Sequence, residues 1–257
     1  MARILTIVNQ KGGVGKSTTA QALGAGLTLK GYRTLVVDLD AQGNTSFSLG
    51  AKNKAPNALN VLMKESTAKE AIQPTSYADL IVSSKALSNA DLLLTETGKE
   101  YRLKEALKNV ADLYDYIIVD TPPTLGVLST NALTAADAVI IPALADLYSL
   151  QGIADLAETI RLVKRYCNPN LRIEGILLNR YDARSNFTEE VSDLANDIAK
   201  RLDSKVFSAS IRETVTVRKA QASQMSIYEY APKAKVTADY LCLLNEIIEG
   251  EKSNGES

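Results

Sequence analysis

The sequence predicts a single α/β domain, built on one mostly parallel β-sheet with helices on both faces. Short apolar, β-branched runs alternate along the chain with segments of helical period, which is the pattern of βαβ units. The 257 residues, of which 46% are hydrophobic and 23% charged, are enough for one sizeable core. The sequence contains no linker, repeat or low-complexity segment. We therefore expect one domain over residues 1–250 and a polar, disordered tail over residues 251–257.

In the first half of the chain, strands are predicted from short apolar runs and helices from apolar residues three or four apart. The run 4–8 leads into a glycine-rich loop and then a helix over 17–30, which Gly31 ends. The run 34–38 predicts a buried strand, and the run 116–120, which is continuously rich in β-forming residues, predicts a central strand of a parallel sheet. The stretch between these two strands is predicted to hold a loop to about residue 54, helices over 59–65, 68–72 and 100–113, and a strand over 80–82.

The second half continues the alternation of strands and helices. A helix is predicted over 127–136, then a strand over 138–141 that Pro142 closes, then a long helix over 150–166. The remaining predictions are strands over 172–178 and 205–207, and helices over 188–202, 215–222 and 235–249. Active sites in such sheets lie beyond the carboxyl ends of the strands, so polar residues at those ends are the candidates for chemistry.

The segment Lys11-Gly12-Gly13-Val14-Gly15-Lys16-Ser17-Thr18 joins the first strand to the first helix. Glycines let backbone N–H groups turn toward an anion, and the helix start adds unpaired N–H groups and a positive dipole end. We assign all eight residues to phosphate binding, with Lys16 at the terminal phosphates and the Ser17 hydroxyl on Mg²⁺. Gln10 stands where the general pattern has glycine, and a second lysine, Lys11, precedes the glycines. The alternative is a glycine turn with two solvated lysines.

Two groups of carboxylates end predicted strands. Asp120 follows an apolar run and precedes Thr121-Pro122-Pro123. This is the position where nucleotide-binding proteins with such a phosphate loop hold Mg²⁺, usually through water. Asp38 and Asp40 are two residues apart, so they point to one side of an extended backbone and repel unless a cation lies between them. The alternatives are a helix-capping aspartate at Asp120 and a solvated loop aspartate at Asp40.

With Lys11, the segment Asp120-Thr121-Pro122-Pro123 and the stretch 38–44, the sequence resembles the ParA/MinD group of P-loop ATPases over nearly its whole length. The resemblance implies ATP and Mg²⁺ as cofactors, and a homodimer in which Lys11 reaches the partner's nucleotide. It also implies that Asp40 orients the attacking water and joins Ser17 and Asp120 at the metal. Lys11, Lys16 and Asp40 are thus the expected catalytic residues of an ATPase with weak basal activity. Ala41 replaces the family's usual proline.

The resemblance further implies an adenine site. Asn179 ends a predicted strand, and its side chain offers both a donor and an acceptor to the base. The loop over 211–214 occupies the family's second adenine-side segment. Taken alone, an asparagine after a strand is a turn residue, so this assignment comes from the resemblance.

Arg184, Arg218 and Lys219 are the expected contacts to double-stranded DNA, bound without sequence preference by the ATP dimer, again as the resemblance implies. Residues 201–235 hold seven cations and three anions, although the net charge of the whole chain is −1. Any nucleic-acid binding must therefore come from a local patch. An ordinary solvated face is the alternative, and Gln224-Met225 replaces a frequent Gly-Lys pair.

Composition excludes several classes of function. The chain has no histidine, which rules out Ser-His-Asp catalysis and histidine metal sites. Its two cysteines form neither a metal-spaced pair nor a disulfide framework, which fits a reducing cytosol. An iron-protein-like reductase needs cluster-binding cysteines just after the segment 120–123, and none is there.

The resemblance implies a ParA/Soj-type partition ATPase of the short kind without an amino-terminal helix-turn-helix domain. Such a protein is cytoplasmic and nucleoid-associated in bacteria, and a ParB-like or small DNA-binding adaptor stimulates its hydrolysis. One alternative is the same chemistry positioning a protein cargo. Another is a MinD-like membrane-associated division regulator, which needs a basic amphipathic carboxy-terminal helix. Residues 236–257 instead hold five acids and one lysine, so we expect no stable membrane binding.

Overall fold

A computed structural model describes residues 1–52, 56–181 and 188–255 of the chain. Its strands form one sheet of eight, in the order β3-β4-β2-β5-β1-β6-β7-β8. Only the β3–β4 pair is antiparallel among these pairings. The strands are β1 (Arg3–Ile7), β2 (Thr34–Asp38), β3 (Ile72–Pro74), β4 (Asp79–Ile81), β5 (Tyr116–Asp120), β6 (Ala138–Leu144), β7 (Arg172–Tyr181) and β8 (Ile211–Arg212). The predicted α/β fold class is confirmed.

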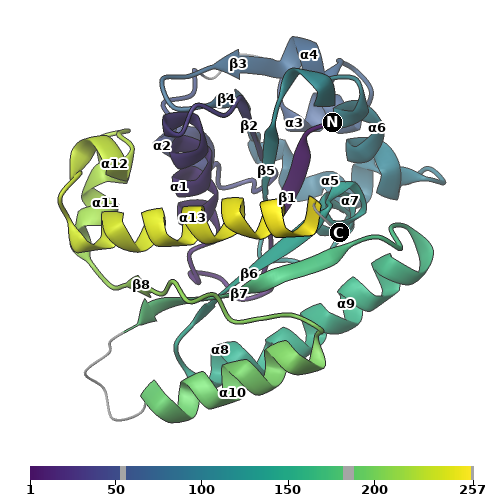
Figure 1. Cartoon of the computed structure of the whole chain (residues 1–257). Helices are drawn as coiled ribbons and strands as arrows, with labels where there is room; N and C mark the ends of the chain where they lie inside the picture. Colours follow the sequence, from purple (N-terminus) through teal and green to yellow (C-terminus); the bar gives the residue numbers. More distant parts are fainter. Residues whose placement is uncertain (53–55, 182–187, 256–257) are drawn as a thin grey trace.

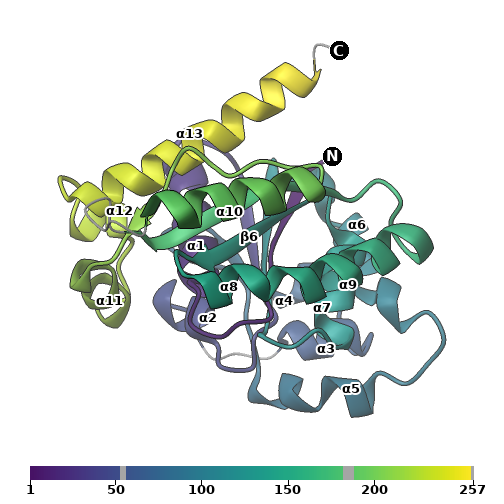
Figure 2. The same ribbon diagram turned by 90° about the horizontal axis from the view of Figure 1, so that it is seen from below.

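Helices cover both faces of the sheet (Figure 1). One face carries α1 (Lys16–Leu29), α2 (Asn44–Ser48), α11 (Val215–Ala222), α12 (Ile227–Tyr230) and α13 (Lys235–Gly255). The other carries α3 (Ala58–Leu62), α4 (Ala68–Ala71), η1 (Lys85–Asn89), α5 (Ala90–Leu93), η2 (Lys99–Tyr101), α6 (Arg102–Lys108), η3 (Ala111–Leu113), α7 (Val127–Ala135), α8 (Leu147–Gln151), α9 (Ile153–Tyr166) and α10 (Thr188–Arg201). In Figure 1 α9 and α10 lie side by side at the bottom of the view, away from α13, and Figure 2 shows the molecule from that side.

Burial on both faces explains why the central strands are continuously apolar. In β5, Tyr116 and Ile118 pack with α1 and α13, whereas Ile117 and Val119 pack with α6 and α7. All four side chains are at most 2% exposed. Successive residues of a strand point to opposite faces, so a strand covered on both faces needs an apolar residue at every position.

Several predicted boundaries are wrong. The helix predicted over 150–166 is two helices, because Asp146 caps α8 by accepting a hydrogen bond from Ser149 N at 2.7 Å and α9 begins after Gly152. The helix predicted over 100–113 is divided into η2, α6 and η3. The strand predicted over 205–207 is reduced to a single bridge from Val206 to Ile176.

Other differences concern where elements end. β6 continues through Pro142 to Leu144, because β1 pairs with β6 only as far as Ile140 and the missing N–H therefore breaks no bond to β1. Asn9 Nδ2 donates to the Pro142 carbonyl at 2.7 Å on that side. α2 forms inside a predicted loop, and α13 runs beyond the predicted end at Glu249 to Gly255.

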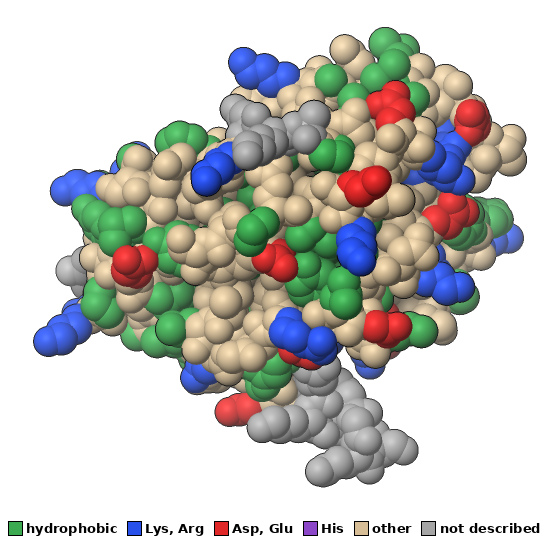
Figure 3. All heavy atoms as spheres, turned by 90° about the horizontal axis from the view of Figure 1, so that it is seen from above, with side chains coloured by type: hydrophobic (Ala, Val, Ile, Leu, Met, Phe, Trp, Pro, Cys, Tyr) green, Lys and Arg blue, Asp and Glu red, His purple; other side chains and the backbone are tan. Residues whose placement is uncertain are grey.

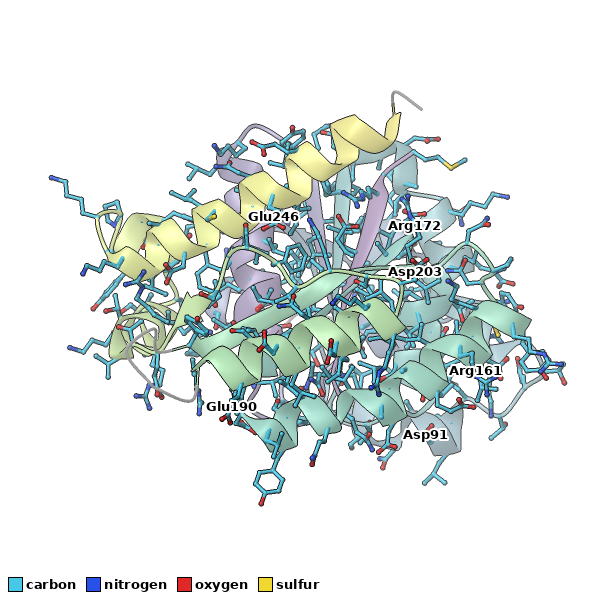
Figure 4. The ribbon with its side chains drawn as sticks, turned by 60° about the horizontal axis from the view of Figure 1, so that its bottom comes forward. Asp91, Arg161, Arg172, Glu190, Asp203 and Glu246 are labelled. Atoms are coloured by element: carbon cyan, nitrogen blue, oxygen red, sulfur yellow. The ribbon has the colours of Figure 1, made fainter. Side chains whose placement is uncertain are left out.

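The connection from α10 to β8 is fastened to α13. Glu246 of α13 accepts hydrogen bonds from Lys205 Nζ at 2.8 Å and Ser208 Oγ at 2.7 Å (Figure 4). This attachment carries the chain back to the sheet edge where β8 lies. None of the helices in the part of the chain that the structure describes combines the length and apolar composition that a membrane span requires.

Candidate nucleotide site

The predicted phosphate loop joins β1 to α1 at the carboxyl edge of the sheet. Gly13 and Gly15 have φ values of 74° and 95°, in the left-handed region that glycine adopts without strain. Gly15 is the N-cap of α1 and provides no side-chain cap. A Cβ at Gly15 would lie 2.5 Å from Asn179 Nδ2. The loop thus leaves the first-turn N–H groups of α1 available to an anion. Position 15 requires glycine, both because of its positive φ and because a side chain would collide with Asn179.

Lys16 is held inside the loop. The residue is 6% exposed, and its Nζ donates to the Lys11 carbonyl at 3.2 Å. Burial lowers the pKa of Lys16, while the nearby carboxylates of Asp120 and Asp40 act in the opposite direction. The Lys16 ammonium therefore lies beside the loop, close enough to Asp120 and Asp40 for both carboxylates to affect its pKa.

Asp120 ends β5 as predicted and is fully buried. Its Oδ2 accepts a hydrogen bond from Thr45 Oγ1 at 2.7 Å, but its Oδ1 has no partner among the described residues. Burial, and then the charge of Asp38, raise the pKa of Asp120 to about 8. A buried carboxylate oxygen without a partner is costly unless a cation or its water shell supplies one.

The residues present fit Mg²⁺. The described residues contain no group of three or more acidic or sulfur ligands that could cage a metal. Mg²⁺ does not need such a cage, because it commonly takes one or two protein oxygens, several waters and substrate phosphates. The unsatisfied Oδ1 of Asp120 and the hydroxyl of Ser17, which lines the same cavity as Asp40, are oxygen donors of the required kind.

Asp38 and Asp40 differ in what they do. Asp38 is fully buried and accepts hydrogen bonds from Ser46 N at 2.8 Å, Ser46 Oγ at 2.7 Å and Asp40 N at 3.1 Å. Burial raises its pKa to about 6. Asp40 is 8% exposed, lines the cavity and accepts from Gln42 N at 3.0 Å. Asp38 therefore shapes the loop that presents Asp40.

Sequence reasoning missed Thr45 and Ser46. Both lie at the start of α2, where Thr45 binds Asp120 and Ser46 binds Asp38. Thr45 Oγ1 is also 3.2 Å from the Ser17 carbonyl, so one hydroxyl bridges the phosphate loop and the metal carboxylate. Their only sequence signal is a pair of hydroxyl residues shortly after the Asp38–Asp40 pair.

Asn179, the predicted adenine contact, lines the cavity beside the phosphate loop. It is 5% exposed, its Nδ2 donates to the Val14 carbonyl at 2.6 Å, and its Oδ1 has no partner among the described residues. The pairing of β7 with β8 shifts register between Asn179 and Tyr181, and Arg180 has a φ of 54°. This irregularity lets consecutive residues face the same cavity, since Asn179 and Arg180 both line it.

Most of the predicted nucleotide residues line one cavity of about 580 Å³, but Asp120, which is fully buried, is not part of its lining. The lining includes Gly12–Thr18, Asp40, Asn179, the segment Ile211–Thr214 and one side of α11. Lys11 does not line this cavity. Its Nζ lies 3.4 Å from Asp146 Oδ1 on the N-cap of α8, and the two side chains are 38% and 40% exposed. Beside this pair, Tyr148 is 79% exposed.

The predicted DNA contacts are only partly described. Arg184 lies outside the described residues. Arg218 and Lys219 are exposed on α11, and Arg218 also lines the cavity. On the face shown in Figure 3, Lys and Arg side chains are scattered among Asp and Glu, in keeping with the net charge of −1.

Comparison with known proteins identifies close relatives. The family model described as "AAA domain" matches residues 2–173. The chromosome partitioning protein ParA of Myxococcus xanthus is 38% identical over 253 residues, 96% of this chain and 88% of that protein. The sporulation initiation inhibitor protein Soj of Bacillus subtilis is 38% identical over 252 residues, 96% of this chain and 98% of that protein. A structure of cobyrinic acid a,c-diamide synthase from Mycobacterium smegmatis, with bound ATP analogue and magnesium, has a TM-score of 0.87 and 33% identity, covering 99% of this chain and 97% of the other.

Proposed function

Since this chain belongs to the ParA/Soj family of AAA-domain partition ATPases, with ATP and Mg²⁺ as cofactors, we propose that it is an ATP-dependent DNA partition switch. In this proposal an ATP-sandwich homodimer binds DNA without sequence preference, and partner-stimulated hydrolysis releases it. The observation that carries the proposal is the position of Lys11. This lysine belongs to the phosphate loop but points away from its own cavity, to a partly exposed ion pair with Asp146.

Hydrolysis in this site depends on positioning and charge. Lys16 and the first-turn N–H groups of α1 hold the phosphates, and Asp40 orients the attacking water. Ser17 and Asp120 would hold Mg²⁺, which supplies positive charge at the phosphates when bound. The cavity is lined by no strong general base among the described residues, so the basal rate is weak.

Dimerisation would complete the site. Lys11 leaves Asp146 and contacts the triphosphate bound to the second protomer. Each cavity thus gains a second lysine beside its own Lys16. The exposed Tyr148 and Leu147, next to Asp146, lie on the same edge and supply apolar contact area to the second copy.

The dimer would then present cations to DNA. Lys219 and Arg218 on α11, together with Arg184, are the proposed phosphate contacts, and binding should fall steeply with salt. A ParB-like or small DNA-binding adaptor would trigger hydrolysis, and the protein would act in the bacterial cytoplasm on the nucleoid. We follow the partition relatives because their identity, 38%, exceeds the 33% of the structure named as a synthase.

DNA retention tests the switch. Retention of duplex DNA is measured with Mg-ATP, Mg-ADP and no nucleotide, for the wild type, Lys16→Ala and the control Lys64→Ala. Lys64 pairs with Glu105 at 3.0 Å on the other face of the sheet, so its removal makes the same charge change away from the cavity. We expect retention only with ATP, lost in Lys16→Ala and kept in the control. Retention that ignores nucleotide, or that survives Lys16→Ala, refutes the proposal.

A further inference from the structure

Helix α11 is attached to the rest of the protein by few apolar contacts. Of its eight residues only Ala220 is buried and Val217 packs half-buried against the core, while Arg218 and Lys219 are exposed. So little apolar area contributes little to fixing a helix, and the hydrogen bonds of its side chains then decide where it lies. These bonds lead to the two segments that line the nucleotide cavity.

Gln221 connects α11 to the phosphate loop. Its Nε2 donates to Thr18 Oγ1 at 3.1 Å and lies 3.3 Å from Gln21 Oε1. Thr18 is in the first turn of α1 and lines the cavity. Because its oxygen accepts from Gln221, the Thr18 O–H remains free to donate to an oxygen of a nucleotide in the cavity. One hydroxyl can therefore join the ligand to α11 in a continuous, mutually polarising chain of hydrogen bonds.

Gln224 connects the end of α11 to α2. Its Nε2 donates to the Phe47 carbonyl at 3.1 Å. α2 also holds Thr45, which binds Asp120, and Ser46, which binds Asp38. Gln224 has a φ of 51°, a conformation that favours glycine. The Gln224 side chain at this strained position thus reaches α2, the helix whose Thr45 binds Asp120.

We propose that Gln221 is a positioning residue that couples nucleotide at Thr18 to the placement of the cationic helix α11, with Gln224 as a second link from α2. The DNA-binding consequence rests on the proposed function, whereas the coupling itself does not. A bound nucleotide gives the Thr18 O–H an acceptor and changes the contacts of α2. Gln221 and Gln224 transmit these two changes to α11. Nucleotide thereby holds α11 more firmly in its cation-presenting position.

Hydrogen exchange of the α11 amides tests the coupling without DNA. The protein is compared with no nucleotide, with Mg-ADP and with Mg and a non-hydrolysable ATP analogue. We expect the analogue to slow amide exchange in α11 of the wild type. In the near-isosteric Gln221→Leu this protection should be about fivefold smaller, because the variant lacks the free energy of one neutral hydrogen bond. The exposed Ser223→Ala, at the same helix end, keeps the wild-type response. An unchanged response in Gln221→Leu, or no response in the wild type, overturns the proposal.

Gln224→Gly separates coupling from mere support of the fold. Glycine relieves the positive φ, so the thermal midpoint should stay the same or rise, while the response of α11 to the ATP analogue falls. A lowered midpoint with an unchanged response contradicts the proposed role. The variant also answers the question if Gln221→Leu fails to fold.

DNA affinity distinguishes this proposal from the proposed function. By reciprocity, the factor by which the ATP analogue strengthens DNA binding equals the factor by which DNA strengthens analogue binding, and Gln221→Leu should reduce both factors equally. If the wild type binds no DNA but α11 responds to nucleotide, the partition function fails and the coupling stands. If DNA binding follows ATP equally in wild type and Gln221→Leu, the function stands and the coupling fails.

Discussion

Replacing Asp146 by Asn tests whether the lysine of the phosphate loop is held back by its own chain. The Lys11 ammonium lies 3.4 Å from Asp146 Oδ1. Asn is as good an N-cap as Asp, so it can still accept the bond from Ser149 N that Asp146 accepts at 2.7 Å. Asp146→Asn therefore removes the charge of the ion pair and leaves α8 capped.

The exposure of the pair sets the size of the effect. With side chains 38% and 40% exposed, the pair belongs with surface ion pairs, which contribute about 0.2–1 kcal/mol. If Lys11 must leave Asp146 for the dimer to form, each of two protomers is relieved of this amount. The association constant of the ATP-bound dimer should then rise by about 2- to 30-fold.

Sedimentation velocity over a range of protein concentrations, with a non-hydrolysable ATP analogue, measures this constant. The gain should be present at about 0.01 M salt and disappear at about 1 M, because the screening length falls from roughly 30 Å to 3 Å. Asp112→Asn, at an exposed position of η3, makes the same charge change as a control. A dimer weakened by Asp146→Asn, or an equal gain in the control, would show that Asp146 does not restrain Lys11.

Three further predictions concern the cavity. Because burial raises the pKa of Asp120 from 3.8 to about 8, the protein without nucleotide should lose thermal stability as the pH rises from about 4 to 8. In calorimetry Asp120→Asn should flatten this dependence of stability on pH, and an identical dependence in the variant would contradict the burial argument. Gly15→Ala, at φ 95° and 2.5 Å from Asn179, should lower the free energy of unfolding by about 1–3 kcal/mol in denaturant titrations, whereas Gly12→Ala, with nothing within 4 Å, should change it far less. Asn179→Leu should weaken ATP binding by about 1–3 kcal/mol in calorimetric titration while GTP binding changes less, because the free Oδ1 suits the amino group of adenine; equal losses would refute adenine recognition.

The central sheet could be predicted because its strands are covered on both faces. The run Tyr116–Asp120 has apolar residues at four successive positions, and only a doubly covered strand needs that pattern. α2 could not be predicted in this way. Its residues, Asn44–Ser48, are mostly small and polar, and two of their hydroxyls bind Asp120 and Asp38. Such a helix depends on contacts with distant segments more than on its own propensity.

The candidate site shows the same division. The glycines and lysines of the loop specify a local backbone shape, so their role follows from the sequence itself. The pairing of Lys11 with Asp146 joins residues 135 positions apart, and no local pattern encodes it. The positive φ of Arg180 at the register shift in β7 likewise arises from pairing with β8, a strand of two residues that was not predicted.

Two buried polar atoms in and beside the cavity have no hydrogen-bond partner among the described residues. They are Oδ1 of Asp120, which is fully buried and does not line the cavity, and Oδ1 of Asn179, which lines it. The first turn of α1 has no side-chain cap. Each group costs free energy until a ligand supplies its partner, so we expect ATP with Mg²⁺ to relieve all three together. A ligand lacking either the base or the metal relieves only part of this cost. We therefore expect ATP with Mg²⁺ to bind more tightly than either part alone, because only the complete ligand supplies partners to all of these groups.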